Sequence, residues 1–270
     1  MGEPTCWSAE AFNQVPHSEN EIHGNEVAKK HGFEGGLVPG VTVSAYIIHP
    51  AVVAWGAAFL ERGKAEIGVQ KPLYDRRAFT VDVTPGEGDS YQAVLTDGMG
   101  VACAQGAVSL PAEPADPPTL RGDRRAPKPG ERKRATRQEM ERLREVGMGT
   151  VSSPWNNDTP MRTYLRDAAQ MPVLLQPEAG AFANASFGLG MTNWALSANA
   201  HLGPWLHLHT TSQNLAPIPM GSDVILESAI ADLFEKKGHE FVDLACQAYL
   251  RDGTPVMEAR LRAIYQLAGK

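Results

Sequence analysis

The longest apolar stretch of the chain covers residues 41–60, and its apolar side chains fall on every side of a helix. A helix that is hydrophobic all round is a buried helix. The stretch is long enough to cross a bilayer, but His49, Pro50 and several small residues interrupt it, which favours a buried helix over a membrane span. Residues 187–200 are also small and apolar, so they predict a second helix.

Alternating apolar and polar residues follow each predicted helix. The clearest case is 77–84, where Phe79 and Val81 alternate with polar residues, a pattern typical of a strand with one buried face. Asp97 is followed by Gly98, a pair typical of a hairpin turn. The predicted strands are 64–70, 77–84, 90–96 and 101–110 after the first helix, and 206–210, 223–233, 240–250 and 256–267 after the second.

The two halves of the chain repeat each other. Residues 92–98 read QAVLTDG and residues 247–253 read QAYLRDG, and a valine follows each of these stretches (Val101 and Val256). A repeat on this scale indicates two copies of one structural unit. Each copy is one apolar helix followed by a meander of antiparallel strands, which places the chain in the α+β class.

Residues 111–138 are rich in proline and charge and poor in apolar side chains, which is typical of a linker. Residues 136–146, at the end of this segment and beyond it, are predicted to form a helix. Residues 161–171 are predicted to be helical or irregular. A basic cluster in the linker favours a solvated surface over contact with a phosphate-bearing ligand. The cluster is Arg121, Arg124, Arg125, Lys128, Arg132, Lys133 and Arg134. The expected domains are 1–112 and 141–270, joined by a linker at 113–140.

Composition narrows the function. The net charge of −6 gives no reason to expect binding to nucleic acid or to acidic membranes. Three cysteines are too few for a disulfide framework, and residues 1–20 lack the basic start and apolar core of a secretory signal, so we expect a cytoplasmic protein. The sequence shows no serine nucleophile elbow, phosphate-loop lysine or dinucleotide fingerprint, and we expect no cofactor.

Histidines gather around the predicted strand 206–210. His207 and His209 lie two residues apart, which predicts that both point to the same face of the sheet. With His201 they suggest a metal site, but no cysteine or carboxylate completes a recognisable spacing. A structural or polar-face role is therefore favoured over metal binding. Trp205 and His207 could instead line a pocket from the second half.

Residues 18–46 carry the candidate chemistry. A polar run ends in His23, and a short helix is expected to follow, with Asn25 as its N-cap and Gly32 just after its C-terminus. The glycine-rich loop that continues to Gly40 lets the backbone approach a ligand closely. Because this loop leads into the first buried helix, the N–H groups at the helix start can face an oxygen that gathers negative charge. His23 suits general-base chemistry near neutral pH.

This segment resembles the motif of the MaoC-like hydratases and dehydratases of the hot-dog fold, G-D-x-N-P-[LI]-H-x-[DN], followed by a short helix, a Gly-Phe pair, a glycine turn and a long central helix. Ser18 departs from the motif because it stands in the position of the catalytic aspartate, and Glu21 replaces the proline. With the internal repeat, the chain resembles the double hot-dog proteins, in which two tandem antiparallel sheets each wrap a long apolar helix. The matching residues are Asn20, Ile22, His23, Asn25, Ala28, Gly32, Phe33 and Gly40.

The resemblance implies an enzyme of the hydro-lyase class. It would hydrate a 2-enoyl thioester, or dehydrate a 3-hydroxyacyl thioester, on coenzyme A or an acyl carrier protein. His23 would be the base, Ser18 would take the aspartate position, and Asn20 would brace the loop. Assembly into a homodimer is a further expectation. The residues expected at the thioester oxygen or around the substrate are Gly40, Val41, Phe33, Asn25, Trp205 and His207.

Two alternatives stay open. A hot-dog thioesterase would hydrolyse an acyl thioester with a carboxylate, which Glu21 or Glu26 would supply. A non-catalytic protein would have kept the fold and would only bind acyl thioesters. Ser18 and Glu21 also fit a helix capping box, in which Ser18 would be structural. Glu19, like Glu21 and Glu26, is close enough in sequence to replace the missing aspartate.

Overall fold

An antiparallel sheet of ten strands crosses the described part of the molecule, in the order β1-β3-β4-β5-β2-β9-β12-β11-β10-β7. The computed structural model describes residues 2–119, 125–177 and 181–268. The two halves of the sheet have the same strand order when each is read from its outer edge inward. The first half reads β1, β3, β4, β5, β2, and the second half reads β7, β10, β11, β12, β9. The sheet is therefore two copies of one five-stranded unit. The strands are β1 Trp7–Glu10, β2 Lys64–Val69, β3 Ala78–Pro85, β4 Ser90–Asp97, β5 Ala102–Ser109, β7 Val151–Pro154, β9 Leu206–Asn214, β10 Asp223–Lys236, β11 His239–Leu250 and β12 Pro255–Gln266.

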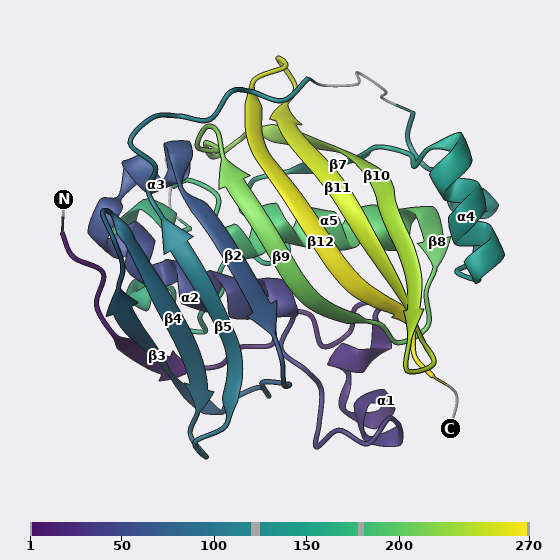
Figure 1. Cartoon of the computed structure of the whole chain (residues 1–270), viewed down its shortest axis with the longest axis horizontal. Helices are drawn as coiled ribbons and strands as arrows, with labels where there is room; N and C mark the ends of the chain where they lie inside the picture. The colour runs from purple at the N-terminus through teal and green to yellow at the C-terminus, as the bar shows by residue number, and fades with distance from the viewer. Residues whose placement is uncertain (1, 120–124, 178–180, 269–270) are drawn as a thin grey trace.

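Two long apolar helices, α2 (Gly40–Trp55) and α5 (Ala185–Asn199), lie against one face of this sheet and pack on each other (Figure 1). Both expected central helices are confirmed. The stretch 41–60 does not form one helix, because Gly56, with a φ of 55°, breaks it between α2 and α3 (Ala57–Arg62). Glycine adopts this conformation without the strain that a side chain would bring.

The two halves meet edge to edge along β2 and β9, where Ile67 lies opposite Thr210. The two expected sheets thus form one continuous sheet. Behind this seam, the hydroxyl oxygens of Thr42 on α2 and Ser186 on α5 are 3.0 Å apart. The main cluster of buried apolar side chains draws on both halves, so the core between helices and sheet is shared.

The shorter helices flank the sheet. In Figure 1, α1 (Asn25–Lys30) lies below the strands, and α4 (Arg137–Val146) packs beside β10. The helix predicted at α4 is confirmed, with Thr136 as its N-cap. Residues 161–171 are irregular except for the 3-10 turn Ala168–Gln170. Within the described residues, no helix combines the length and apolarity that crossing a membrane requires.

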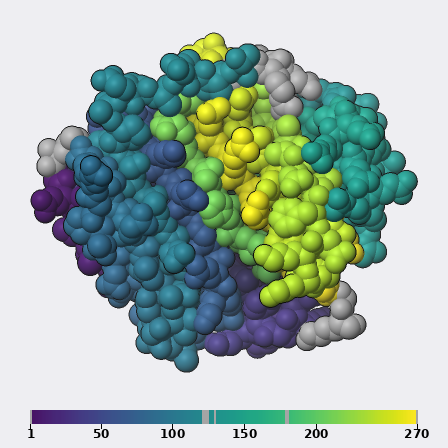
Figure 2. All heavy atoms as spheres, viewed as in Figure 1, coloured from purple at the N-terminus to yellow at the C-terminus, as the bar shows by residue number. Residues whose placement is uncertain are grey.

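The outer face of the sheet, away from α2 and α5, forms much of the molecular surface. In Figure 2 the green and yellow strands of the second half lie in the middle of the visible surface. The teal chain that leaves β5 passes along one end of these strands. The site residues predicted from the sequence do not gather on this outer face. Most of them lie on the side of the sheet that α2 and α5 cover.

The linker between the halves is folded in part. β6 (Lys133–Arg134) pairs in parallel with β8 (Ala200–His201), just beyond the end of α5. This pairing turns Arg132 inward, and only 17% of its side chain is exposed. The expectation of a solvated basic surface is therefore wrong for Arg132, because a short β-pairing fixes the chain immediately after it. Arg121 and Arg124 lie outside the described residues.

A bulge in β9 separates the two histidines that alternation placed on one face. Arg262 of β12 pairs with His209, and the next residue, Ala263, pairs with His207, so the register shifts by one residue. His207 points to the helices and is 8% exposed. His209 lies on the outer face, 3.3 Å from Glu66. The prediction of a shared face is wrong because alternation holds only in a regular strand.

Candidate functional site

His23 is held in one tautomer by its neighbours. It ends the 3-10 turn Glu21–His23, and its Nδ1 lies 2.7 Å from the Leu37 carbonyl oxygen, so Nδ1 carries the hydrogen. Nε2 keeps a lone pair, which accepts a long hydrogen bond from the side-chain nitrogen of Asn20 at 3.4 Å. Burial lowers the pKa of His23, against the opposing effect of the Leu37 carbonyl. His23 is therefore a neutral imidazole at pH 7, with its lone pair at Nε2.

Asn20 joins the His23 loop to the second half of the chain. Its side-chain nitrogen donates to the Trp205 carbonyl at 3.1 Å, and the Trp205 N–H donates to its side-chain oxygen at 3.3 Å. Trp205 immediately precedes β9. These two hydrogen bonds turn the nitrogen of the Asn20 amide toward His23. This geometry fits the bracing role that the motif implies for Asn20.

The glycine at position 36 lets the loop return close to His23. A Cβ at Gly36 would overlap the His23 carbonyl group. The Leu37 N–H donates to the Ile22 carbonyl at 3.2 Å, and the side chain of Asn13 donates to the His23 carbonyl at 2.8 Å. The backbone around His23 is thus fixed from two sides.

Asn25 does not cap α1. The N-cap is Gly24, and Asn25 lies inside the helix, where its side-chain oxygen accepts the Gly36 N–H at 2.9 Å. The prediction is wrong because the tertiary contact with the glycine loop competes with the local cap. Gly32 does follow the helix end with a φ of 87°, as expected of glycine there.

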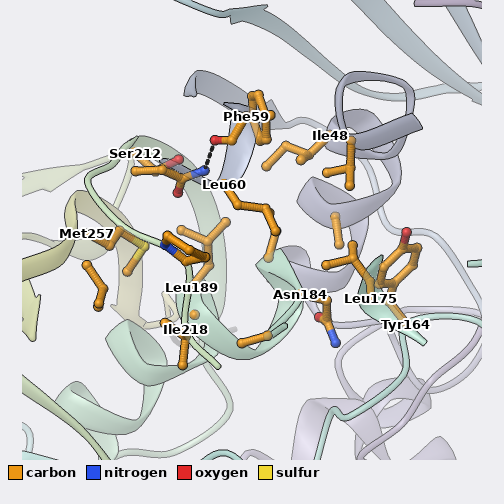
Figure 3. Close-up of a pocket in the computed structure, with 18 of the residues that line it drawn as sticks. Ile48, Phe59, Leu60, Tyr164, Leu175, Asn184, Leu189, Ser212, Ile218 and Met257 are labelled. Carbon is orange, nitrogen blue, oxygen red and sulfur yellow. Dashed lines mark hydrogen bonds between the residues drawn. The ribbon is translucent and has the colours of Figure 1, made fainter. Parts of the chain in front are cut away.

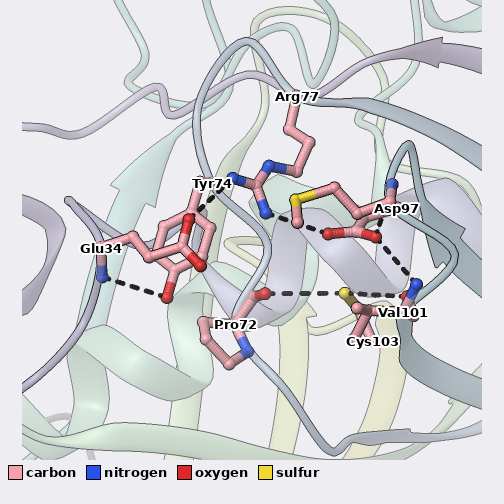
Figure 4. A network of polar contacts seen from close by, with 8 residues as sticks. Glu34, Pro72, Tyr74, Arg77, Asp97, Val101 and Cys103 are labelled. Carbon is pink, nitrogen blue, oxygen red and sulfur yellow. Dashed lines mark hydrogen bonds and ion pairs between the residues drawn. The ribbon is translucent and has the colours of Figure 1, made fainter.

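A charged network ties the same loop to the sheet (Figure 4). Arg77 donates to Asp97 at 3.1 Å and to Glu34 at 2.8 Å. The Glu34 N–H donates to the Tyr74 hydroxyl at 3.3 Å. Burial alone would raise the pKa of Asp97, but backbone N–H groups of the hairpin turn and the Arg77 guanidinium lower it. Asp97 thus anchors the glycine loop from the β4–β5 hairpin.

The start of α2 presents backbone N–H groups without a side-chain cap. Its N-cap is Pro39, which makes no side-chain capping hydrogen bond. A Cβ at Gly40 would lie 2.8–2.9 Å from three atoms of the His207 side chain, so this close approach needs glycine. Such a helix start favours a negatively charged oxygen. His23 borders two cavities, which are described below. Gly40 lines one of them, whereas Val41 is fully buried and lines neither.

His207 is held at both ring nitrogens. Its Nδ1 lies 3.1 Å from the side-chain oxygen of Asn193 on α5, and its Nε2 lies 2.6 Å from the Thr210 hydroxyl. Burial lowers its pKa to about 3, with a smaller contribution from His209. His207 is thus a neutral wall of the site beside Gly40, with no free lone pair for a base.

Two cavities adjoin His23 within the described residues. One, of about 140 Å³, is mostly apolar and includes Phe33 and Gly40 in its lining. The other, of about 400 Å³, is lined by both polar and apolar side chains. His23 stands at the boundary, because four residues line both cavities: Asn20, His23, Asn193 and Trp205.

Ser18 lies on the larger cavity together with His23. Its hydroxyl donates to the Asn20 carbonyl at 3.2 Å. The expected capping box is wrong: Asn20 is the N-cap of the 3-10 turn, and no side-chain cap forms there. Ser18 and His23 therefore line the same cavity, and Glu21 does not form the reciprocal capping hydrogen bond with Ser18.

The three nearby carboxylates differ in position. Glu19 lines the larger cavity and pairs with Arg132 at 3.0 Å. Glu21 and Glu26 are exposed and are absent from the lining of both cavities. Among the described residues, no carboxylate is hydrogen-bonded to His23. The structure thus gives no support to a carboxylate role for Glu21 or Glu26.

Some residues of the site escaped the sequence reasoning. Asn193 lines both cavities and holds His207; a polar residue within the apolar stretch 187–200 was the available signal. Leu37 acts through its carbonyl group, which no side-chain pattern reports. Arg132 was one of seven basic residues, and nothing in the sequence set it apart.

The second half repeats the frame around His23 with other side chains. Its 3-10 turn Val173–Leu175 occupies the place of Glu21–His23. The Phe182 N–H donates to the Leu174 carbonyl at 2.9 Å, as the Leu37 N–H does to Ile22 in the first half. Leu175, which follows Leu174 as His23 follows Ile22, therefore stands in the position of His23.

The helix start of the second half is closed. The side chain of Asn184 caps α5 by accepting the Phe187 N–H at 3.2 Å, and its nitrogen donates to the carbonyls of Met161 and Arg162. Figure 3 shows Leu175 and Asn184 close together at a cavity of about 50 Å³. The space that corresponds to the site is here small and largely filled.

No protein-family profile matches the sequence, and no curated protein does. Solved structures match it over nearly its whole length. A conserved hypothetical protein from Mycobacterium tuberculosis with a double hot-dog fold is 12% identical, with a TM-score of 0.61, over 98% of this chain and 96% of that one. A putative thioesterase II from Thermobifida fusca is 12% identical, with a TM-score of 0.54, over 99% and 94% of the two chains.

A third solved structure is a MaoC-like dehydratase, 11% identical, with a TM-score of 0.53, over 98% of each chain. Identities this low establish a common fold and leave the activity to be argued from the site. The expected architecture, two helix-wrapping sheets in tandem, agrees with these matches. The chain therefore has the α+β double hot-dog fold, which it shares with a MaoC-like dehydratase.

Proposed function

We propose that the protein is a hydro-lyase that hydrates a 2-enoyl thioester, or dehydrates a 3-hydroxyacyl thioester, carried on coenzyme A or an acyl carrier protein. The observation that carries this proposal is that His23 and the uncapped start of α2 line the same cavity of about 140 Å³. A neutral base and a backbone donor facing one small space suit a reaction that moves a proton while a carbonyl oxygen gains charge.

The proposed hydration proceeds in two proton transfers. His23 Nε2 takes a proton from water as the water oxygen bonds to Cβ of the enoyl group. The electron pair of the double bond shifts toward the thioester, and the N–H of Gly40 stabilises the charge on its oxygen. The imidazolium of His23 then returns the proton to Cα, and dehydration is the reverse.

Ser18 is proposed to hold the attacking water. Ser18 lines the cavity that His23 also lines, and its hydroxyl oxygen, which donates its own hydrogen to the Asn20 carbonyl, can accept a hydrogen bond from water. Unlike an aspartate, it carries no charge to stabilise the imidazolium. We therefore expect Ser18→Asp to raise the rate of hydration.

The test follows the absorbance of the conjugated enoyl thioester when the purified protein meets a panel of 2-enoyl-CoAs. His23→Leu is the matched variant, because Leu175 already fills the same position in the second half and the change is compatible with the fold. Loss of a general base lowers rates by about 10²–10⁴-fold, so hydration should nearly vanish in His23→Leu. Unfolding midpoints of both proteins verify that the fold is kept.

Hydration by wild type that persists unchanged in His23→Leu would refute the role of His23. If no enoyl-CoA is hydrated but acyl-CoA stabilises the protein against heat, the protein is an acyl-thioester-binding module or a thioesterase. Release of free thiol then identifies the thioesterase. These outcomes separate the three functions that the sequence left open.

A further inference from the structure

An arginine from the linker reaches the larger cavity beside His23. Arg132 lines this cavity of about 400 Å³ together with Ser18 and Asn20. Among the described residues in its lining, Arg132 is the one permanent cation. Its side chain is 17% exposed, whereas that of its ion-pair partner Glu19 is 71% exposed. The cavity wall thus carries a mostly buried positive charge on Arg132, and its ion-pair partner Glu19 lies at the surface.

The hydrogen bonds of Arg132 leave the guanidinium incompletely paired. Nη1 donates to the Ser197 carbonyl at 2.9 Å and to Glu19 at 3.0 Å, and Nη2 reaches Glu19 only at 3.5 Å. Nε is buried and, within the described part of the chain, has no hydrogen-bond partner. Buried donors are normally satisfied, and guanidinium binds carboxylate or phosphate through two parallel hydrogen bonds.

The backbone that follows Arg132 is fixed, so the charge has a defined position. Lys133 pairs with Ala200 in the β6–β8 ladder, and the Ala135 N–H donates to the His201 carbonyl at 2.9 Å. Ser197 lies in the last turn of α5, whose carbonyl end favours a cation. Arg132 is therefore built into the cavity wall by both the linker and α5.

Glu19 is the replaceable partner in this arrangement. Only the Glu19 side of this ion pair is exposed, and a substrate anion that replaces Glu19 keeps the Arg132 charge paired, so the exchange costs little free energy. Its own hydrogen bond with Arg132 lowers the pKa of Glu19, which keeps it an anion near neutral pH. The Glu19 carboxylate therefore binds the Arg132 guanidinium in the way that a ligand anion would.

We propose that Arg132 binds an anionic oxygen group of the substrate, a carboxylate or a phosphate, and that Glu19 holds this position until the substrate displaces it. The inference rests on the proposed acyl-thioester function. A carboxylate would belong to the acyl chain and a phosphate to the carrier. The guanidinium chemistry is the same for both, and the experiment below separates them.

The experiment measures binding by calorimetry with thioether analogues, which are neither hydrated nor hydrolysed. S-butyl-pantetheine is neutral, S-butyl-CoA carries phosphates, and S-(4-carboxybutyl)-pantetheine carries a carboxylate on the chain. The variants are Arg132→Ala and Glu19→Gln. Arg134→Ala is the matched control, since it removes the same charge from an exposed position two residues along the chain.

One of the two anionic probes should bind wild type about tenfold more tightly than the neutral probe, and Arg132→Ala should abolish this difference. Glu19→Gln should tighten the same probe about threefold, because it removes the competing carboxylate while the neutral probe is unaffected. Arg134→Ala should change no affinity by more than about twofold. The probe that responds identifies the source of the anion.

The inference would be overturned by equal binding of all probes, by equal weakening of neutral and anionic probes in Arg132→Ala, or by weaker anion binding in Glu19→Gln. The last variant keeps the test decisive if Arg132→Ala does not fold. Arg132-dependent binding without any enoyl hydration would refute the proposed reaction and support the anion site. Absence of binding by every probe would refute both.

Discussion

The two halves of the molecule hold the same frame around two different helix starts. In the first half, α2 begins after Pro39 without a side-chain cap, and His23 stands beside it. In the second half, the cap Asn184 closes the start of α5, and Leu175 stands where the histidine would be. The backbone hydrogen bonds that place these two turns are the same in kind and close in length.

The comparison shows that the fold does not require an open site. A 3-10 turn packed against a helix start is stable with leucine and a cap, as in the second half. In the first half the uncapped N–H groups cost stability, since backbone donors are left without a side-chain cap. His23, whose pKa is lowered by burial, costs further stability as the pH falls below about 6.5. Such a local cost is typical of a functional site.

Among the changes that compare the two helix starts, the largest effect is expected from Gly40→Ala. The new Cβ would meet the His207 side chain at 2.8–2.9 Å, so the helix start and the cavity wall must move apart. A displacement of about 1 Å at reacting groups lowers rates by about 10²-fold, and enoyl hydration should fall by that order.

The matched control for this change is Gly188→Ala on α5. The Cβ added there meets the Met257 sulfur at 3.8 Å, an ordinary contact. Hydration by this variant should equal that of wild type, and its stability should be equal or slightly higher because alanine is the better helix former. Equal losses in both variants would show that the two helix starts do not differ in function.

A smaller and opposite pattern is expected from Asn184→Ala. The change removes the cap of α5 and the hydrogen bonds that a nearly fully buried side chain makes to Met161 and Arg162. Urea unfolding should show a loss of about 2–3 kcal/mol. The specific activity of the folded protein should stay unchanged, and a large fall in it would mean that the second half takes part in the reaction.

The smallest effect concerns pH and a buried histidine at the cavity of about 50 Å³ beside Leu175 and Asn184. His49 lines that cavity, its Nδ1 lies 2.9 Å from the Tyr164 hydroxyl, and burial lowers its pKa to about 4. Below pH 6.5 the unfolded chain takes up this proton first, so stability is complete above pH 6.5 and is lost as the pH falls toward 4. At pH 5 His49 alone accounts for a loss of about 2 kcal/mol, and His207, whose pKa burial also lowers, adds to it.

Urea midpoints at pH 7 and pH 5 measure this loss. His49→Gln should lose less stability between the two pH values than wild type does. His31→Gln, which changes an exposed histidine, is the control and should behave as wild type. An unchanged acid loss in His49→Gln would show that His49 is not the group that titrates.

Much of the frame could be predicted from local pattern. Alternation and the QAVLTDG repeat predicted the long strands of both halves, and the all-apolar stretches predicted α2 and α5. The edge strands β1 and β7 were missed, because four residues give too short a pattern to recognise. The β9 bulge also escaped, since an extra residue in one strand is visible only against its partner.

The candidate site, too, was predicted in part and missed in part. The motif pointed to His23, Asn20 and Gly40, and the structure places all three on one cavity. It could not give the tautomer of His23, which depends on the Leu37 carbonyl. It also gave Asn25 the wrong partner, because the Gly36 N–H that it binds comes from the loop that returns.

By itself, the sequence determined that two similar units, each a buried helix with an antiparallel meander, follow each other, because burial and strand alternation are written in local periodicity. Only the tertiary structure decided that Arg132 enters the cavity beside His23, that Asn193 holds His207, and that Leu175 stands in the position of His23. These relations join residues far apart in the chain or in different halves. Their partners are chosen by packing and by the satisfaction of buried hydrogen bonds, and no local pattern records that choice.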